Sequence, residues 1–251
     1  SNFISSESEN EIIFTGGTTE SINLLAHSLG NKLSAGDEIL VSEMEHHANL
    51  VPWQMACQRT GANLKFIPID KKGDLDLSDL ETLFTNSTRI ISITQVSNVL
   101  GTINPINDIA KIANEIGAIF IVDGAQGVPH QSINVKELGC DFYAFSGHKM
   151  LAPTGVGVLW GRMEKLEEME PFMGGGEMIE TVTMESSTWN QVPYKFEAGT
   201  PNFVQAVGLG AAIDYLNNFG MDKVSEHEKK LTEYALAKMS QIEQVNVFGS
   251  P

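Results

Sequence analysis

The sequence predicts an α/β protein whose mostly parallel β-sheet is covered by helices on both faces. Short β-rich runs alternate with amphipathic segments as far as Trp160. Such alternation is typical of parallel strands joined by crossover helices. The chain has 251 residues, of which 42% are hydrophobic and 19% charged. This composition is globular, and the length suits one large domain or one domain with part of another.

The expected strands are short runs rich in β-branched and aromatic residues. Between them, apolar residues recur at the helical spacing i, i+3, i+4, i+7. This helical pattern occurs in residues 22–29 and 106–113. The strand-like runs cover residues 38–42, 64–69, 90–94, 118–122, 142–145 and 156–160.

The pattern changes after Trp160. Residues 161–200 are irregular and are expected to form an extended excursion, with a tight loop at the glycines 174–176. Two helices are expected at 203–219 and 221–239. One face of the first helix is expected to be buried, formed by Val204, Val207, Ala211 and Tyr215.

Charge and composition exclude several classes of partner and location. The formal net charge of −16 argues against binding to nucleic acid or to an anionic membrane, because both need a cationic face. No apolar stretch approaches the roughly 20 residues that span a bilayer. The two cysteines, Cys57 and Cys140, lack metal-ligand spacing and fit a reducing, cytoplasmic setting. Both thiols are expected to be buried and inert.

Two of the expected strands lead into residues with reactive side chains. Asp123 directly follows the run 118–122, and Lys149 follows the run 142–145 after a short turn. The carboxyl ends of parallel strands meet at one edge of an open sheet, where ligands bind. A lysine that forms a Schiff base and a carboxylate that pairs with a pyridinium nitrogen are the minimal set for pyridoxal 5'-phosphate (PLP) chemistry. Taken singly, Asp123 could instead form a turn or bind a metal, and Lys149 could be a solvated surface group.

A phosphate site is predicted at the start of the first helix. Gly16 and Gly17 allow the main chain to approach a ligand, and a helix N-terminus offers free N–H groups and partial positive charge. Thr18 or Thr19 can add a hydroxyl group. The simpler alternative is that a threonine caps the helix. No lysine follows the glycines, so the segment is not a Walker A loop.

Other polar residues are candidates for the same site. Ser146 and His148 lie next to Lys149 and could hold a phosphate by hydrogen bonds. Thr200 lies in the turn before the helix expected at 203–219 and offers a further hydroxyl group.

Adjacent histidines follow the strand expected at 38–42. On an extended segment His46 and His47 point to opposite sides, which argues against a shared metal ion. One of them could lie flat against a cofactor ring and act as an acid or base. The alternative is a histidine that caps the helix beginning near Leu50.

Taken together, these segments resemble the class V aminotransferase family, and within it the cysteine desulfurases and selenocysteine lyases of the SufS/CsdA type. The resemblance runs from Ile12 to the end of the chain. It is carried by ordered motifs at residues 15–20 (TGGTTE), 43–49 (EMEHHAN), 96–101 (VSNVLG), 122–126 (VDGAQ), 145–149 (FSGHK), 174–179 (GGGEMI) and 196–202 (FEAGTPN).

The resemblance implies the large domain of a fold type I PLP enzyme, which is usually a homodimer. Such enzymes remove sulfur or selenium from L-cysteine or L-selenocysteine and leave L-alanine. Lys149 would form the Schiff base and move protons, Asp123 would pair with the pyridinium nitrogen, Gln126 with the ring oxygen, and His46 would stack on the ring.

The resemblance also implies the remaining ligand contacts. Thr18, Thr19, Ser146 and His148 would hold the phosphate, Thr200 would complete that site from the partner subunit, and Asn98 would lie near the substrate carboxylate. A sulfur-acceptor protein and a cytoplasmic role in iron–sulfur cluster assembly follow from the same family.

One departure concerns the sulfur-accepting cysteine and the substrate-binding arginine, which lie in the C-terminal small domain of this family. The contexts of Cys57 and Cys140 do not match the catalytic loop. We therefore expect residues 1–240 to form the PLP-binding large domain without its N-terminal segment, and 241–251 to begin an otherwise absent small domain. We expect this chain to be an incomplete fragment of the enzyme that is inactive by itself. The alternatives are another class V PLP enzyme and a non-catalytic scaffold of the same fold.

Overall fold

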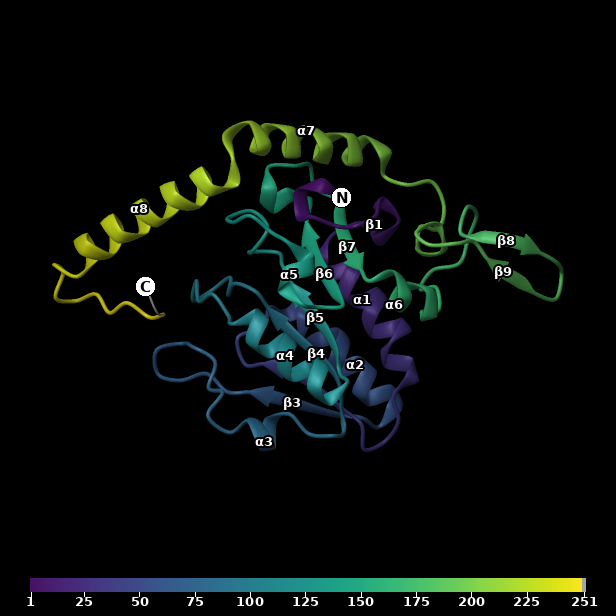
Figure 1. Cartoon of the computed structure of the whole chain (residues 1–251), viewed down its shortest axis with the longest axis horizontal. Coiled ribbons are helices and arrows are strands. Elements are labelled where there is room, and N and C mark those ends of the chain that lie inside the picture. The colour runs from purple at the N-terminus through teal and green to yellow at the C-terminus, as the bar shows by residue number, and fades with distance from the viewer. Residues whose placement is uncertain (250–251) are drawn as a thin grey trace.

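A seven-stranded mixed sheet forms the centre of the computed structural model, which describes residues 1–249 (Figure 1). The strands lie in the order β1-β7-β6-β5-β4-β2-β3. All neighbours from β6 to β3 are parallel, whereas β7 runs antiparallel to both β6 and β1. The strands are β1 Ile12–Thr15, β2 Glu38–Ser42, β3 Asn63–Ile67, β4 Thr88–Thr94, β5 Ile119–Asp123, β6 Phe142–Ser146 and β7 Gly157–Gly161.

This architecture confirms the predicted fold class and its strands. Each expected run became a strand, with ends that differ from the expected ones by at most two residues. The sequence analysis missed β1, an edge strand of four residues that pairs with β7. Its few apolar residues lie just before the glycines that precede the first helix, so this short run was not recognised as a strand.

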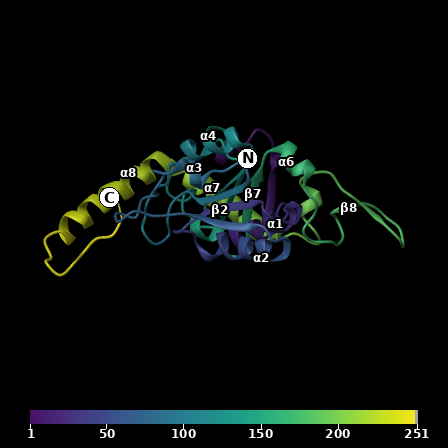
Figure 2. The same ribbon diagram turned by 90° about the horizontal axis from the view of Figure 1, so that it is seen from below.

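Helices cover both faces of the sheet, as the sequence predicted. Figure 2 shows α4 on one side of the strands and α1 and α2 on the other. The helices are α1 Thr18–Ser28, α2 Val51–Thr60, α3 Leu80–Leu83, α4 Ile106–Ile116, α5 Val135–Leu138, α6 Met163–Glu168, α7 Phe203–Phe219 and α8 Met221–Met239. Short 3-10 turns are η1 Asn2–Ile4, η2 Glu9–Glu11, η3 Gly30–Lys32, η4 His47–Asn49, η5 Gly147–Met150 and η6 Tyr194–Phe196.

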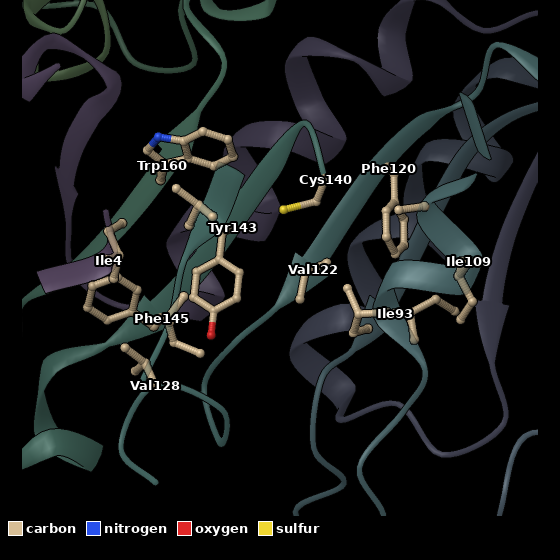
Figure 3. Packing of buried hydrophobic residues seen from close by; sticks show 14 of the residues in the cluster. Ile4, Ile93, Ile109, Phe120, Val122, Val128, Cys140, Tyr143, Phe145 and Trp160 are labelled. Atoms are coloured by element: carbon tan, nitrogen blue, oxygen red, sulfur yellow. The ribbon is translucent and has the colours of Figure 1, made fainter. Parts of the chain in front are cut away.

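Alternate residues of each central strand contribute to two separate apolar cores. In β5, Ile121 packs in the core with α1 and α2, while Phe120 and Val122 pack in the core that contains α4. Successive side chains of a strand point to opposite faces, and both faces of this sheet are covered, so the central strands contain runs of consecutive apolar residues. Figure 3 shows the second core, to which Phe120 of β5 and Ile109 of α4 both belong.

The buried face of α7 differs from the predicted one. Val204, Val207 and Tyr215 are exposed, with 75% of Val207 accessible, and Ala211 is exposed too. The residues of α7 that are buried are Leu209, Ala212 and Leu216. Apolar residues occur on more than one side of this helix, so their spacing alone could not decide which side contacts the sheet domain.

Residues 161–200 contain more regular structure than the sequence analysis predicted. They include α6 and a two-stranded antiparallel hairpin, β8 Ile179–Val182 with β9 Ser187–Trp189. The hairpin projects from the body of the molecule, opposite to α8 (Figure 1). Its strands are short and mostly exposed, and their threonine, serine and glutamate residues hide the alternation that marks a half-buried strand.

In the described part of the chain, no helix combines the length and the apolar composition that crossing a bilayer requires.

The loop after β5 packs directly on a buried aromatic ring, so we expect Gly124→Ala to destabilise the fold. A Cβ atom at Gly124 would overlap the ring of Tyr143. That ring cannot move freely, because it is fully buried and its hydroxyl donates to Gln95 Oε1 at 2.6 Å. Overpacking of this kind costs about 1–3 kcal/mol.

Urea unfolding measures this cost, and Gly174→Ala is the matched control. Among residues 1–249, no heavy atom other than those of Gly174 and its two chain neighbours lies within 4 Å of the Cβ position there, so this substitution should change the free energy of unfolding by less than about 0.5 kcal/mol. Equal stability of the two variants would contradict the packing argument.

Candidate active site

Asp123 ends β5 inside the molecule. Its side chain is 3% exposed, and its Oδ1 accepts the main-chain N–H of Ala125 at 2.9 Å. Among residues 1–249 no other group donates a hydrogen bond to this carboxylate, so its second oxygen remains available to a further donor. Burial raises the pKa of Asp123, while the Ala125 N–H, the positive charge of Lys149 and the electrostatic interaction with His46 act in the opposite direction. The fold therefore brings Asp123, Lys149 and His46 within electrostatic reach of one another.

Lys149 lies in η5, directly after β6, and is half-buried. β6 pairs in parallel with β5, and Ala144 lies opposite Asp123 in this pairing. The lysine and the acid thus emerge from the same edge of the sheet, as the sequence predicted from the ends of the two strands.

His46 caps a short turn through its ring. Its Nδ1 accepts the N–H of Ala48 at 3.0 Å, which leaves Nε2 as the N–H of the neutral imidazole. The alternative expectation, that a histidine acts as a cap, is therefore correct. The element that His46 caps is η4, however, and not the expected helix α2. His47 begins η4, so the pair does not continue as a strand, and the two ring centroids lie 5.9 Å apart.

The predicted threonine cap of α1 is wrong. Gly17 occupies the N-cap position, with φ of 150°, and it has no side chain that could accept a hydrogen bond from the first N–H groups of the helix. Instead Ser146 at the end of β6 supplies the acceptor. Its Oγ accepts the N–H of Thr18 at 2.8 Å and lies 2.8 Å from Thr18 Oγ1. This contact joins the start of α1 to the strand that leads to Lys149.

A cavity of about 390 Å³ opens at the N-terminus of α1. Thr19, Ser146 and His148, three of the residues predicted to hold a phosphate, line it together with the glycines that precede the helix. Thr18 is buried behind Ser146. The fold thus gathers hydroxyl groups, an imidazole and a helix N-terminus around one space, which is a typical setting for an anion.

Three other predicted residues occupy different positions. Gln126 is half-buried in the loop after Asp123. Asn98 is exposed in a turn after β4. Thr200 is exposed and lines a second cavity of about 310 Å³, which shares Gly16 and Glu20 with the first. The structure therefore does not place Thr200 beside Ser146 and His148 within this chain.

The sequence analysis missed a buried acid, Glu45, that directly precedes His46. Its Oε1 accepts the N–H of Thr94 at 2.9 Å and the hydroxyl of Ser42 at 2.5 Å, and its Oε2 accepts the side-chain amide of Asn49 at 2.6 Å. Burial raises the pKa of Glu45 to about 7 despite these donors, and the negative charge of Asp123 adds to the rise. An acid within a run of polar residues gives no sequence signal of burial.

The two cysteines differ in their surroundings. Cys140 is fully buried, and burial raises the pKa of its thiol to about 12, as expected for an inert thiol. Cys57 on α2 is only half-buried, so the expectation of a buried thiol is wrong for it. Burial raises its pKa nonetheless. In the described residues no group of histidines, cysteines and acids is arranged to hold a metal ion.

Comparison with known proteins identifies the family. The sequence model described as Aminotransferase class-V matches residues 1–251. The chain belongs to the class V aminotransferase family. A probable cysteine desulfurase of Halalkalibacterium halodurans is 52% identical over 248 residues, which are 98% of this chain and 61% of that protein. A cysteine desulfurase of Salmonella newport is 50% identical over 251 residues, covering 99% of this chain and 62% of that protein.

Solved structures give the same relationship. The cysteine desulfurase CsdA of Escherichia coli, crystallised as the S-sulfonic acid, matches with a TM-score of 0.90 and 41% identity over 94% of this chain and 60% of that chain. The apo cysteine desulfurase of Thermococcus onnurineus matches with a TM-score of 0.95 and 40% identity over 99% of this chain and 62% of that chain. The class V aminotransferase chain thus has the fold predicted for it, and it spans about 60% of the length of these curated relatives.

Glu45 should make the protein less stable as the pH rises. Its carboxyl has a pKa of about 7 in the folded chain and 4.5 as an ordinary glutamate, so the folded state holds the extra proton between these values. This contribution to stability is complete below about pH 4.5 and is lost as the pH rises through about 7. The loss is on the order of 3 kcal/mol.

Urea unfolding near pH 5 and near pH 8 tests this dependence. Glu45→Gln cannot titrate, so it should lose less stability than the wild type over this interval. Glu43→Gln, an exposed glutamate of the same segment, should behave as the wild type does. If the free energy of unfolding changes with pH in the same way for the wild type and Glu45→Gln, Glu45 does not retain a proton in the folded state.

Proposed function

We propose that this chain forms the PLP-binding part of a cysteine desulfurase or selenocysteine lyase. The reaction removes sulfur or selenium from L-cysteine or L-selenocysteine and leaves L-alanine. One observation carries the proposal: Lys149 and the buried Asp123 emerge from the ends of neighbouring strands, and His148, next to Lys149 in the chain, lines a cavity at a helix N-terminus. The relatives named cysteine desulfurases support the choice of reaction.

The residues present fit PLP. Asp123 has an oxygen available for a cationic ring N–H, which would give its buried charge a partner. The cavity at α1 suits a phosphate group, and the half-buried Lys149 directly follows His148, which lines this cavity. When bound, PLP supplies an electron sink for carbanion chemistry at Cα of the substrate.

We assign roles to the chain's own residues on this basis. Lys149 would hold the cofactor through Nζ and would move a proton to or from Cα of the substrate. Asp123 would pair with the ring nitrogen. His46 would lie against the ring, held in orientation by its bond to Ala48 N–H. Gln126 would hydrogen-bond the ring oxygen.

Polar groups around α1 would hold the phosphate. Thr18, Thr19, Ser146 and His148 are assigned to this role, and Asn98 to the substrate carboxylate. Thr200 would complete the phosphate site of a partner subunit. Its exposed position in a separate cavity of this chain is consistent with that role.

A homodimer is part of the proposal. Large apolar side chains on α7, among them Phe203, Val204 and Val207, are exposed in this chain and could be covered by a second subunit. We further propose that residues 1–240 belong to the PLP-binding large domain and that 241–251 begin a small domain.

The proposal places the enzyme in the cytoplasm, where it passes sulfur to an acceptor protein for iron–sulfur cluster assembly. The thiol that takes up sulfur is assigned to neither Cys140 nor Cys57, because burial raises the pKa of both thiols and so disfavours the reactive thiolate.

The covalent role of Lys149 is directly testable. Addition of PLP to the protein should give the visible absorption band of a PLP–lysine Schiff base, and borohydride reduction followed by mass spectrometry should locate the label on Lys149. Lys149→Ala should lose both signals, whereas Lys136→Ala, which removes an exposed surface lysine, should keep them. Absence of the band, or a label elsewhere, would contradict the proposal and favour a non-catalytic scaffold.

The phosphate site gives a second test, through Ser146→Ala. This change removes the Oγ that holds Thr18 and lines the cavity, so it should weaken PLP binding about 10- to 100-fold. Binding of pyridoxal, which lacks the phosphate, should change little.

Equilibrium titration of both compounds separates the two effects. The matched control is Ser132→Ala, a serine that is exposed and bonds Asp222 far along the chain. Equal losses for PLP and pyridoxal would indicate that Ser146 does not contact the phosphate.

A further inference from the structure

Glu45 anchors the loop that carries His46. Through its two oxygens it joins Ser42 at the end of β2, Thr94 at the end of β4 and Asn49 in η4. His46 lies directly after Glu45 in this loop. The imidazole is exposed, so its position depends on the residues that hold the loop from behind.

Asn49 extends the same anchor on the other side of His46. It is fully buried, and its Oδ1 accepts the hydroxyl of Ser92 at 2.6 Å and the indole N–H of Trp53 at 3.1 Å. The loop is thus fastened to β4 and α2 as well as to β2. Removing the Glu45 carboxyl would leave Asn49 and Thr94 with unpaired donors.

The carboxyl of Glu45 keeps all its contacts whether or not it carries a proton. The N–H of Thr94 and the amide of Asn49 only donate, and each has an oxygen of Glu45 to accept. The hydroxyl of Ser42 can donate to the carboxylate or accept from the carboxylic acid. One rotation of this hydroxyl therefore accommodates the proton without any other movement.

The charges around Glu45 favour the neutral form. Among residues 1–249 no lysine, arginine or histidine forms an ion pair with it. The acid that faces it from the neighbouring strand is Asp123, which lies opposite Thr94 in the pairing of β4 with β5. Lys149 and His46 act on Asp123. When two carboxyl groups share a buried site, one of them keeps its proton.

We propose that Glu45 is a positioning residue that holds the His46 loop against the sheet as a neutral carboxylic acid, so that Asp123 is the charged carboxylate of the site. The inference rests on the proposed function, because a single charged acid is what a cationic ring nitrogen requires. Burial of Glu45 and its pKa of about 7 support the neutral form at and below neutral pH.

Carbon-13 NMR of protein labelled at glutamate Cδ tests the charge state, with and without PLP. The Glu45 signal, assigned by its absence in Glu45→Gln, should titrate with a midpoint near 7. In PLP-free Asp123→Asn, whose neighbouring charge is gone, the midpoint should fall by about half a pH unit or more. A midpoint in the ordinary range near 4.5, or one that Asp123→Asn leaves unchanged, overturns the proposal.

Controls keep this test decisive. Glu43→Gln should remove a different signal and leave the Glu45 titration unchanged. If Glu45→Gln fails to fold, Glu45→Asp provides the assignment, because it also removes the labelled glutamate. Failure of PLP to bind would count against the proposed function alone, since the Glu45 titration is still measured in the PLP-free protein.

The positioning role has its own readout, the visible circular dichroism of bound PLP, which reports how the ring is held. Glu45→Ala should reduce this signal by about half or more. Glu45→Gln, which is neutral and of equal length, should restore more of it than Glu45→Asp, whose carboxyl group is shorter and can ionise. If Glu45→Asp restores as much of the signal as Glu45→Gln, or more, the neutral-acid role is overturned. An undiminished signal in Glu45→Ala overturns it as well.

Discussion

The parallel pairing of β4, β5 and β6 is the constraint on which the rest of this molecule depends. It aligns the carboxyl ends of three strands at one edge of the sheet, so that Thr94, Asp123 and Ser146 emerge close together. Each residue then organises a different segment. Thr94 binds Glu45 behind the His46 loop, and Ser146 binds the first residue of α1. The candidate site is therefore assembled from segments far apart in sequence by the geometry of one sheet edge.

The same edge concentrates buried charge, which shapes what the site can do. Asp123 and Glu45 are both buried, and burial raises the pKa of each. Asp123 has Lys149 as its counter-charge, whereas Glu45 is held by neutral donors. In our proposal, this difference lets Asp123 act as the electrostatic partner of a ligand while Glu45 holds the His46 loop. A low-dielectric pocket tolerates both only because their surroundings differ.

Much of the fold was predictable from the sequence because local patterns carried it. The apolar runs of the central strands, buried on both faces, and the helical spacing of Ile106 and Ile109 in α4 each have one physical interpretation. The edge strand β1 and the β8–β9 hairpin were missed, since short or exposed strands do not need the apolar pattern. The buried side of α7 was predicted wrongly, because apolar residues on several sides leave the choice to the packing partner.

By itself, the sequence determined the fold class, the family, and the strand ends at which Asp123 and Lys149 would lie, because strand periodicity and motif order are local properties of the chain. Only the tertiary structure decided what surrounds them. It replaced the predicted threonine cap of α1 with Ser146, a residue 128 positions away, and it buried Glu45 against Thr94. Burial and hydrogen-bond partners depend on contacts between distant segments, and these contacts set the charge state of an acid.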